Sequence, residues 1–142
     1  MARGIHIKNR KASFDYFFER ELNAGIQLVG TEVKAIINGK ISLVDSYCYF
    51  KKGELYLKGV NIVSEGVFGH EPNRERKLLL KRKELNKLEK DLLEGMTIVV
   101  KRIFSNDRGK IKVEIALAKG KKNYDKRNSI KEREIDRELK RI

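Results

Sequence analysis

Apolar and polar residues alternate most regularly in the last third of the chain. Residues 97–104 and 110–118 are two runs rich in β-branched side chains, and a short polar segment at 105–109 joins them. Four apolar residues of the second run occupy every second position: Ile111, Val113, Ile115 and Leu117. Because side chains alternate between the faces of a strand, we expect these four to be buried together. The pattern predicts an antiparallel strand pair.

Two further segments have strand-like patterns. Alternation over residues 44–50 resumes at Leu55 and Leu57 after the turn Lys51-Lys52-Gly53, which predicts a hairpin with a candidate bulge at Gly59. Residues 14–22 combine helix-favouring charges with three alternating aromatic residues. The aromatic enrichment leads us to favour a strand there, continuing through residues 25–29.

Helical spacing is found in two places. Thr31 is a candidate N-cap for a short helix with an apolar stripe at Val33, Ile36 and Ile37, and Gly39 marks its end. A second helix is predicted at 81–94, where Leu85, Leu88 and Leu92 recur among Lys and Glu before Gly95. The leucines are expected to pack against the core.

Two remaining segments of the first 118 residues are predicted to be a surface arm and a surface loop. Residues 1–12 contain four basic and no acidic side chains, and residues 64–77 contain Gly66, Gly69 and Pro72 before a basic run ending at Lys77. Short strands with two helices and no βαβ repetition predict a mainly β domain. We expect residues 1–118 to form an OB-like antiparallel β-barrel.

Charge narrows the range of partners. The 142 residues include 33 Lys or Arg against 20 Asp or Glu, for a net charge of +13, which is typical of nucleic-acid binders. The longest apolar runs are only a few residues, as at 78–80, so we expect a cytoplasmic protein that does not bind membranes. The single cysteine, Cys48, lies in a strand pattern and is expected to be a core residue.

A basic tail follows the barrel. Residues 119–142 hold ten Lys or Arg and five Asp or Glu, and Tyr124 lies among the cations, where an aromatic ring can stack on an unpaired base. A capping box at Ser129 and Glu132 precedes an apolar stripe. A helix this short is marginal alone, so we expect the tail to be disordered when free and helical when bound.

The sequence offers little for catalysis. His6 and His70 lie in different segments, and neither has the spacing of a metal site. Gly120-Lys121-Lys122 lacks the first glycine and the Ser or Thr of a phosphate-binding loop. We therefore predict no catalytic residue, no metal and no cofactor.

Several blocks of residues, taken in order, resemble one bacterial family. The blocks are Asn9-Arg10-Lys11-Ala12, Asp15-Tyr16-Phe17, Ala24-Gly25-Ile26, Gly30-Thr31-Glu32-Val33-Lys34, Asp45-Ser46-Tyr47, Arg76-Lys77-Leu78-Leu79-Leu80, residues 112–122, Asp125-Lys126-Arg127 and Ile130-Lys131-Glu132-Arg133. Over nearly its whole length the chain resembles the tmRNA-binding family known as small protein B or SsrA-binding protein.

The resemblance implies a role in trans-translation, the rescue of stalled ribosomes with tagging of incomplete peptides. The barrel would bind the tRNA-like domain of tmRNA, and the tail would occupy the decoding centre and empty mRNA channel, against small-subunit rRNA. Alanyl-tRNA synthetase and elongation factor Tu would be partners through the tmRNA. The resemblance implies an adaptor and no enzymatic activity.

Site residues follow from the same resemblance, position by position. Those implied to meet the tRNA-like domain are Asn9, Arg10, Lys11, Tyr16, Glu32, Lys34, Tyr47, Lys77 and Leu79. Those implied to meet the ribosome are Gly120, Lys121, Lys122, Tyr124, Asp125, Lys126 and Arg127. A structural role for Glu32 and a core position for Leu79 remain open alternatives.

Two positions depart from the family pattern. Asn23 stands where an acidic residue is frequent, and Tyr124 stands where histidine is frequent; tyrosine keeps the stacking capacity of histidine without its positive charge at mildly acid pH. The alternatives are a general OB-fold RNA-binding protein or RNA chaperone, and an RNA-processing hydrolase, which would need a carboxylate cluster and a metal.

Overall fold

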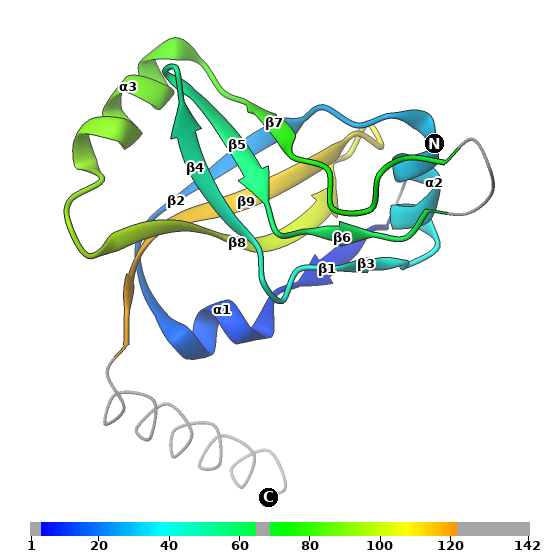
Figure 1. Ribbon diagram of the computed structural model, residues 1–142, viewed down its shortest axis with the longest axis horizontal. Helices are drawn as coiled ribbons and strands as arrows, with labels where there is room; N and C mark the ends of the chain where they lie inside the picture. The colour runs from blue at the N-terminus through cyan, green and yellow to red at the C-terminus, as the bar shows by residue number, and fades with distance from the viewer. Residues whose placement is uncertain (1–3, 65–68, 122–142) are drawn as a thin grey trace, which may run out of the picture.

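The computed structural model describes residues 4–64 and 69–121 of the chain (Figure 1). The expectations for the tail beyond Lys121, including its capping box and conditional helix, lie outside the described residues.

Nine strands and three helices occur in these residues. The strands are β1 (His6–Lys8), β2 (Tyr16–Ile26), β3 (Ile41–Ser42), β4 (Tyr47–Lys51), β5 (Glu54–Lys58), β6 (Asn61–Ile62), β7 (Arg76–Leu79), β8 (Met96–Ser105) and β9 (Ile111–Gly120). The helices are α1 (Arg10–Asp15), α2 (Gly30–Ile37) and α3 (Arg82–Asp91). None of these helices is long and apolar enough to cross a membrane.

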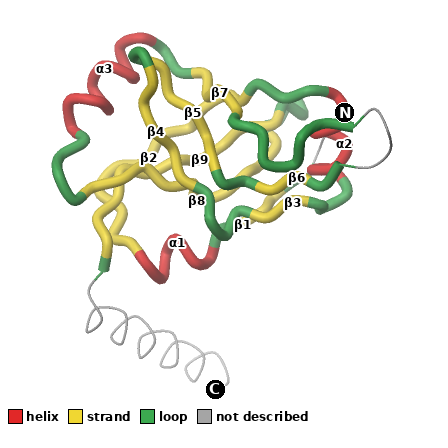
Figure 2. The backbone as a smooth tube through the Cα atoms, viewed as in Figure 1, coloured by secondary structure: helices red, strands yellow, loops and turns green. Residues whose placement is uncertain are grey.

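The main sheet closes on itself. Its order is β1-β8-β4-β5-β7-β2-β9, with a further pairing between β8 and β9, and every pairing is antiparallel. A closed sheet leaves few unpaired edges. The predicted mainly β, barrel-like fold is confirmed. The strands β3 and β6 form a separate two-stranded sheet, and Figure 2 shows the three helices at the margins of the strands.

The predicted strand pair is β8 and β9, aligned from Met96 opposite Lys119 to Ser105 opposite Ile111. Val113, Ile115 and Leu117 are buried in the barrel core, and Ile111 packs against that core while half-buried. The alternate residues of β9, Ala116 and Ala118, are buried too, in a second cluster with Ala12 of α1 and Val99 of β8. At this end β9 is therefore covered on both faces.

The hairpin prediction is also confirmed, as β4 and β5 joined at Lys52 and Gly53. Instead of a bulge, Gly59 marks a close backbone approach: its φ is +81°, and a Cβ there would lie 2.1 Å from the carbonyl oxygen of Asp45. Only glycine avoids that clash.

The two predicted helices are present. In α2, Ile36 is buried, whereas Ile37 is half exposed. In α3, Leu85 and Leu88 are buried. Thr31 is not the N-cap of α2: Val29 holds that position, and its backbone N–H donates to Oε1 of Glu32 at 2.9 Å.

The structure differs from the prediction in three segments. The basic arm contains a strand that was not predicted: β1 adds to the edge of β8 and Ile7 packs against the core, while His6 and Lys8 are exposed, as expected of a surface arm. Residues 14 and 15 belong to α1, so the strand that follows begins at Tyr16. The loop predicted to reach Lys77 ends earlier, because Arg76 is fully buried at the start of β7.

Candidate RNA interface

A buried ion pair lies behind one group of predicted RNA contacts. Glu32 of α2 and Arg76 of β7 are both completely buried, with Arg76 Nε 2.5 Å from Glu32 Oε2. Arg74 donates to the other carboxylate oxygen at 2.6 Å. Arg76 also donates to the carbonyls of Val60 and Pro72, at 3.2 Å each. The pair therefore ties α2, β7 and the segment before β7 together.

The same contacts keep Glu32 ionised. Burial by itself raises the pKa of Glu32. Hydrogen bonds from Arg74, the Val29 amide and Arg76 together lower the pKa by more than burial raises it, so the pKa lies below its ordinary value. Both oxygens accept from protein donors, and the side chain has no exposure. The geometry therefore supports a structural role for Glu32, which holds β7 in place. Sequence analysis left this role open as an alternative to RNA binding.

Leu79 lies beyond this pair, at the exposed end of β7. Its side chain is 46% exposed, so the alternative of a core position is excluded. It pairs with Gly25 of β2, where an added Cβ would lie 3.2 Å from Leu79 Cβ. A groove of about 440 Å³ opens here, lined by Leu79, Gly25, Leu28, Val33 and Lys110 among others. This exposed apolar groove beside a lysine suits an unpaired base or a sugar face.

Two predicted lysines flank this end without touching the groove. Lys77 is one-third exposed on β7, with Nζ 3.9 Å from the Glu54 carboxylate. Lys34 of α2 is exposed and lines a separate small depression with Thr31 and Asn38. We name the groove with these two lysines the Leu79 end of the barrel.

A second group of predicted residues lies elsewhere. Lys11, Tyr16 and Tyr47 line one depression of about 320 Å³, which also contains Asp15 and Asp45. Lys11 Nζ lies 3.9 Å from Asp45, but with both side chains largely exposed this pair contributes little. Tyr47 is 41% exposed, so its ring is accessible for stacking.

Asn9, in contrast to these exposed residues, lies in a buried environment. It is only 8% exposed, and its Oδ1 caps α1 by accepting from the Ala12 amide at 3.3 Å. Its Nδ2 donates to the carbonyls of Val100 at 3.0 Å and Leu43 at 3.2 Å. With both ends of the amide engaged inside the protein, Asn9 joins α1, β8 and the segment before β4.

Arg10 is exposed and lines a third depression, together with residues that sequence reasoning missed: His6, Lys8, Phe18, Lys101, Arg102 and Glu114. The alternation of His6 and Lys8 with Ile5 and Ile7 was the available signal for an outward-facing basic edge. This alternation was not used, because the three residues of β1 are too few to predict a strand.

The predicted tail begins beside this third depression. Gly120 pairs with Tyr16 at the end of β9, and the Lys121 amide donates to the Asp15 carbonyl at 2.8 Å. Lys121 Nζ donates to the Ser13 carbonyl at 3.2 Å and lies 4.9 Å from the centre of the Phe17 ring. The other predicted tail contacts lie outside the described residues: Lys122, Tyr124, Asp125, Lys126 and Arg127.

The predicted site residues thus do not form one site. Tyr16 begins β2, and Gly25, which pairs with Leu79, lies nine positions further along the same strand. At about 3.3 Å per residue, nine positions of strand span at most about 30 Å. We name the surface around Arg10, Lys11, Tyr16 and Tyr47 the α1 end of the barrel. The Leu79 end and the α1 end are separate surfaces.

The part of the chain that is described contains no candidate metal-binding cluster, and its cysteine is not a reactive thiol. No group of three or more His, Cys, Asp or Glu in residues 4–64 and 69–121 could hold a metal ion. Cys48 is buried, as predicted, and burial raises the pKa of its thiol, which remains protonated.

Comparison with known proteins gives consistent results. The model of a family described as SmpB protein matches residues 6–142. An SsrA-binding protein of Phocaeicola vulgatus is 53% identical over 97% of this chain and 95% of its own length. One of Christiangramia forsetii is 49% identical over all of this chain and 93% of its own.

A solved structure, described as "tmRNA-SmpB: a journey to the center of the bacterial ribosome", is 40% identical with a TM-score of 0.70, over 84% of this chain and 87% of the other. The closed barrel, its basic ends and these matches lead to one assignment. The chain belongs to the SmpB protein family.

Proposed function

We propose that this protein binds the tRNA-like domain of tmRNA and brings it to stalled ribosomes in trans-translation. The observation that carries the proposal is the match to the SmpB family from residue 6 to residue 142, with relatives named SsrA-binding protein aligned over almost their full length. The net charge of +13 suits an RNA partner. The protein then acts in the cytoplasm, where translating ribosomes are.

The Leu79 end is the surface that we assign to the tRNA-like domain. It combines an exposed leucine, a close backbone approach at Gly25 and the lysines Lys34, Lys77 and Lys110 around it. Lysines position the phosphates, while the apolar groove accepts a base or sugar. Arg10, Lys11, Tyr16 and Tyr47 form a further candidate contact with the tRNA-like domain at the α1 end of the barrel.

The tail is assigned to the ribosome. It leaves the barrel at Lys121, on the α1 end, so an RNA bound at the Leu79 end does not obstruct it. The residues proposed to engage the decoding centre run from Gly120 to Arg127. In this role the protein is an adaptor: peptidyl transfer belongs to the ribosome, and alanyl-tRNA synthetase and elongation factor Tu act on the tmRNA.

Competition binding tests the assignment. Labelled tRNA-like domain is titrated with the full-length protein, with and without excess tRNA. Preference for the tRNA-like domain supports the proposal, whereas equal competition by any single-stranded RNA favours the alternative of a general OB-fold RNA-binding protein or chaperone.

A matched pair of variants locates the surface. Leu79→Asp places a carboxylate in the groove and should weaken binding of the tRNA-like domain by at least tenfold, because it removes an apolar contact and repels phosphate. Leu93→Asp is the control, since Leu93 is also exposed, at 65%, but lies after α3. Equal weakening by both would show that charge alone, not the groove, decides binding.

A further inference from the structure

A row of residues on the outer face of the barrel leads away from the Leu79 end. From β7 to β8 the row consists of Leu79, Gly25, Lys112 and Phe104, each paired with the next across the sheet. Residues adjacent to them in the sequence are buried in the core: Ala24, Leu78, Ile103 and Val113. Because side chains alternate between the faces of a strand, the row lies on the outer face. Lys112 Nζ lies 3.6 Å from the position of a Cβ on Gly25, so this lysine reaches the groove at Leu79.

A second outward row lies beside the first one. It consists of Asn23, Glu114 and Arg102, which are paired across β2, β9 and β8. Asn23 is two positions from Gly25 but seven from Tyr16, which are spans of at most about 7 Å and about 23 Å along β2. The second row is therefore close to the Leu79 end, and nothing above assigns it a function.

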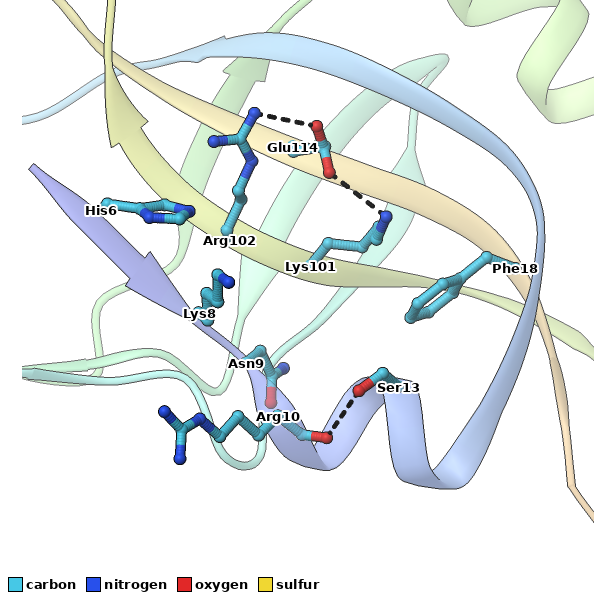
Figure 3. Close-up of a pocket in the computed structure, with 9 residues that line it drawn as sticks. All are labelled: His6, Lys8, Asn9, Arg10, Ser13, Phe18, Lys101, Arg102 and Glu114. Atoms are coloured by element: carbon cyan, nitrogen blue, oxygen red, sulfur yellow. Dashed lines mark hydrogen bonds and ion pairs between the residues drawn. The ribbon is translucent and has the colours of Figure 1, made fainter. Parts of the chain in front are cut away.

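Glu114 is the acidic residue of this second row. Figure 3 shows its carboxylate between Arg102 and Lys101, with an interaction to each. Arg102 Nη2 donates to Glu114 Oε2 at 3.3 Å, and Lys101 Nζ lies 3.4 Å from Oε1. The Glu114 side chain is only 16% exposed. Because a carboxylate repels phosphate, Glu114 does not suit a direct RNA contact, but it can orient the two cations.

The two cations depend on Glu114 to different degrees. Lys101 Nζ also lies 2.7 Å from the carboxylate of Glu21, which holds the lysine without Glu114. Arg102 forms no other ion pair with the described part of the chain, and its guanidinium lies 4.2 Å from the centre of the Phe104 ring. Phe104 thus supports one face of the guanidinium, and Glu114 fixes one edge. The side chain is one-third exposed, and a planar guanidinium held in this way suits a phosphate group.

We propose that Arg102 binds a phosphate of the tRNA-like domain beside the Leu79 groove, and that Glu114 is a positioning residue that holds Arg102 in place for this contact. The proposal rests on the proposed function, because it takes the RNA at the Leu79 end to be the tRNA-like domain. It also fixes the sign of one effect. By charge alone, neutralising Glu114 would strengthen RNA binding, whereas a positioning role requires that binding weakens.

The test uses the full-length protein with Arg102→Gln, with Glu114→Gln and with both changes combined. The control is Glu89→Gln, which makes the same change of charge at an exposed residue of α3 that has no ion pair with the described residues. All variants are first compared with the wild type by thermal unfolding. Binding to the isolated tRNA-like domain is then measured at several salt concentrations.

We expect Arg102→Gln to weaken binding about fivefold at low salt, and Glu114→Gln to weaken it about threefold. The control should bind at least as tightly as the wild type. For Arg102→Gln, the slope of log affinity against log salt should become shallower by about 0.7 to 0.9, for one lost phosphate contact. Because Glu114 acts through Arg102, the combined variant should bind no more weakly than Arg102→Gln alone.

Binding by Glu114→Gln that equals or exceeds binding by the control overturns the proposal, as does an unchanged affinity of Arg102→Gln. Further weakening by Glu114→Gln when Arg102 is already replaced also overturns it, because Glu114 would then act without Arg102. Failure of the wild-type protein to prefer the tRNA-like domain over tRNA would instead contradict the proposed function, so the two failures are distinguishable.

Discussion

The Glu32–Arg76 pair shows how two buried charges depend on each other. Both side chains are excluded from solvent, so removing one partner leaves the other uncompensated in the interior. We expect Glu32→Gln to lower the free energy of unfolding by about 3 to 5 kcal/mol. Chemical denaturation measures this loss.

The control for that prediction is Glu21→Gln, which breaks the ion pair to Lys101 at a carboxylate that is about half exposed. It should cost no more than about 1 kcal/mol. Similar losses in the two variants would mean that Glu32 and Arg76 do not support the fold through their burial.

The pH dependence of the same pair has a defined sign. The pKa of Glu32 in the folded protein lies below its ordinary value of 4.5, so its contribution is complete above 4.5 and declines as pH falls through the lowered pKa. The difference in unfolding free energy between wild type and Glu32→Gln should therefore be constant near neutrality and shrink in acid. A difference that grows on acidification would contradict the ionised state.

Residue types alone did not predict these roles. Glu32 and Asn9 stand in blocks that resemble an RNA-binding family, and both proved to be engaged inside the protein. The partners of Asn9 lie as far away as Val100, and those of Glu32 as far as Arg76. A short local pattern carries no information about such distant contacts. Lys8 was counted among the basic residues of the N-terminal arm but was not assigned to a site, because a single exposed lysine resembles any solvated charge.

At the scale of elements, Asn9 both caps α1 and joins it to β8 and to the segment before β4. Asn9→Asp keeps an oxygen that can accept from the Ala12 amide, but it replaces the Nδ2 donor that meets the carbonyls of Leu43 and Val100. We expect Asn9→Asp to destabilise the protein at least as much as Asn9→Ala, by about 2 kcal/mol or more.

Thermal and chemical unfolding of the two variants check this prediction. A neutral effect of Asn9→Asp would show that capping is the only function of this side chain and that the ties to β8 and the segment before β4 contribute nothing.

The close approach at Gly59 gives a second prediction for an element junction. Gly59→Ala places a Cβ 2.1 Å from the Asp45 carbonyl oxygen, in addition to the strain of a positive φ. Gly39→Ala is the matched control, because Gly39 has a φ of +73° and nothing within 4 Å of an added Cβ. The control should cost about 1 to 2 kcal/mol and Gly59→Ala clearly more. Equal losses would contradict the steric account.

Elements with long, regular patterns were predicted well, and those that depend on a distant neighbour were not. The alternation of apolar and polar residues was sufficient to predict β9 and the β4–β5 hairpin, since these strands pair with strands nearby in the sequence. Among the described strands, β1 pairs only with residues 102–104 near the end of β8, so three residues of local pattern could not reveal it.

For the whole molecule, charge predicts how affinity responds to salt. If about five phosphates are neutralised when the protein binds the tRNA-like domain, log affinity should fall against log salt with a slope of about −3.5 to −4.5. Titrations at several salt concentrations measure the slope. A nearly flat response would indicate that the apolar groove at Leu79 supplies most of the binding.

The division between barrel and tail is the central claim, and peptide tagging by purified stalled ribosomes tests it most directly. A chain ending at Lys121 retains every strand of the barrel, with the contacts of Lys121 to Asp15 and Ser13. The account predicts that this shortened protein binds the tRNA-like domain like the full-length protein but supports no tagging. Tagging at the full-length level, or loss of RNA binding on truncation, would contradict it.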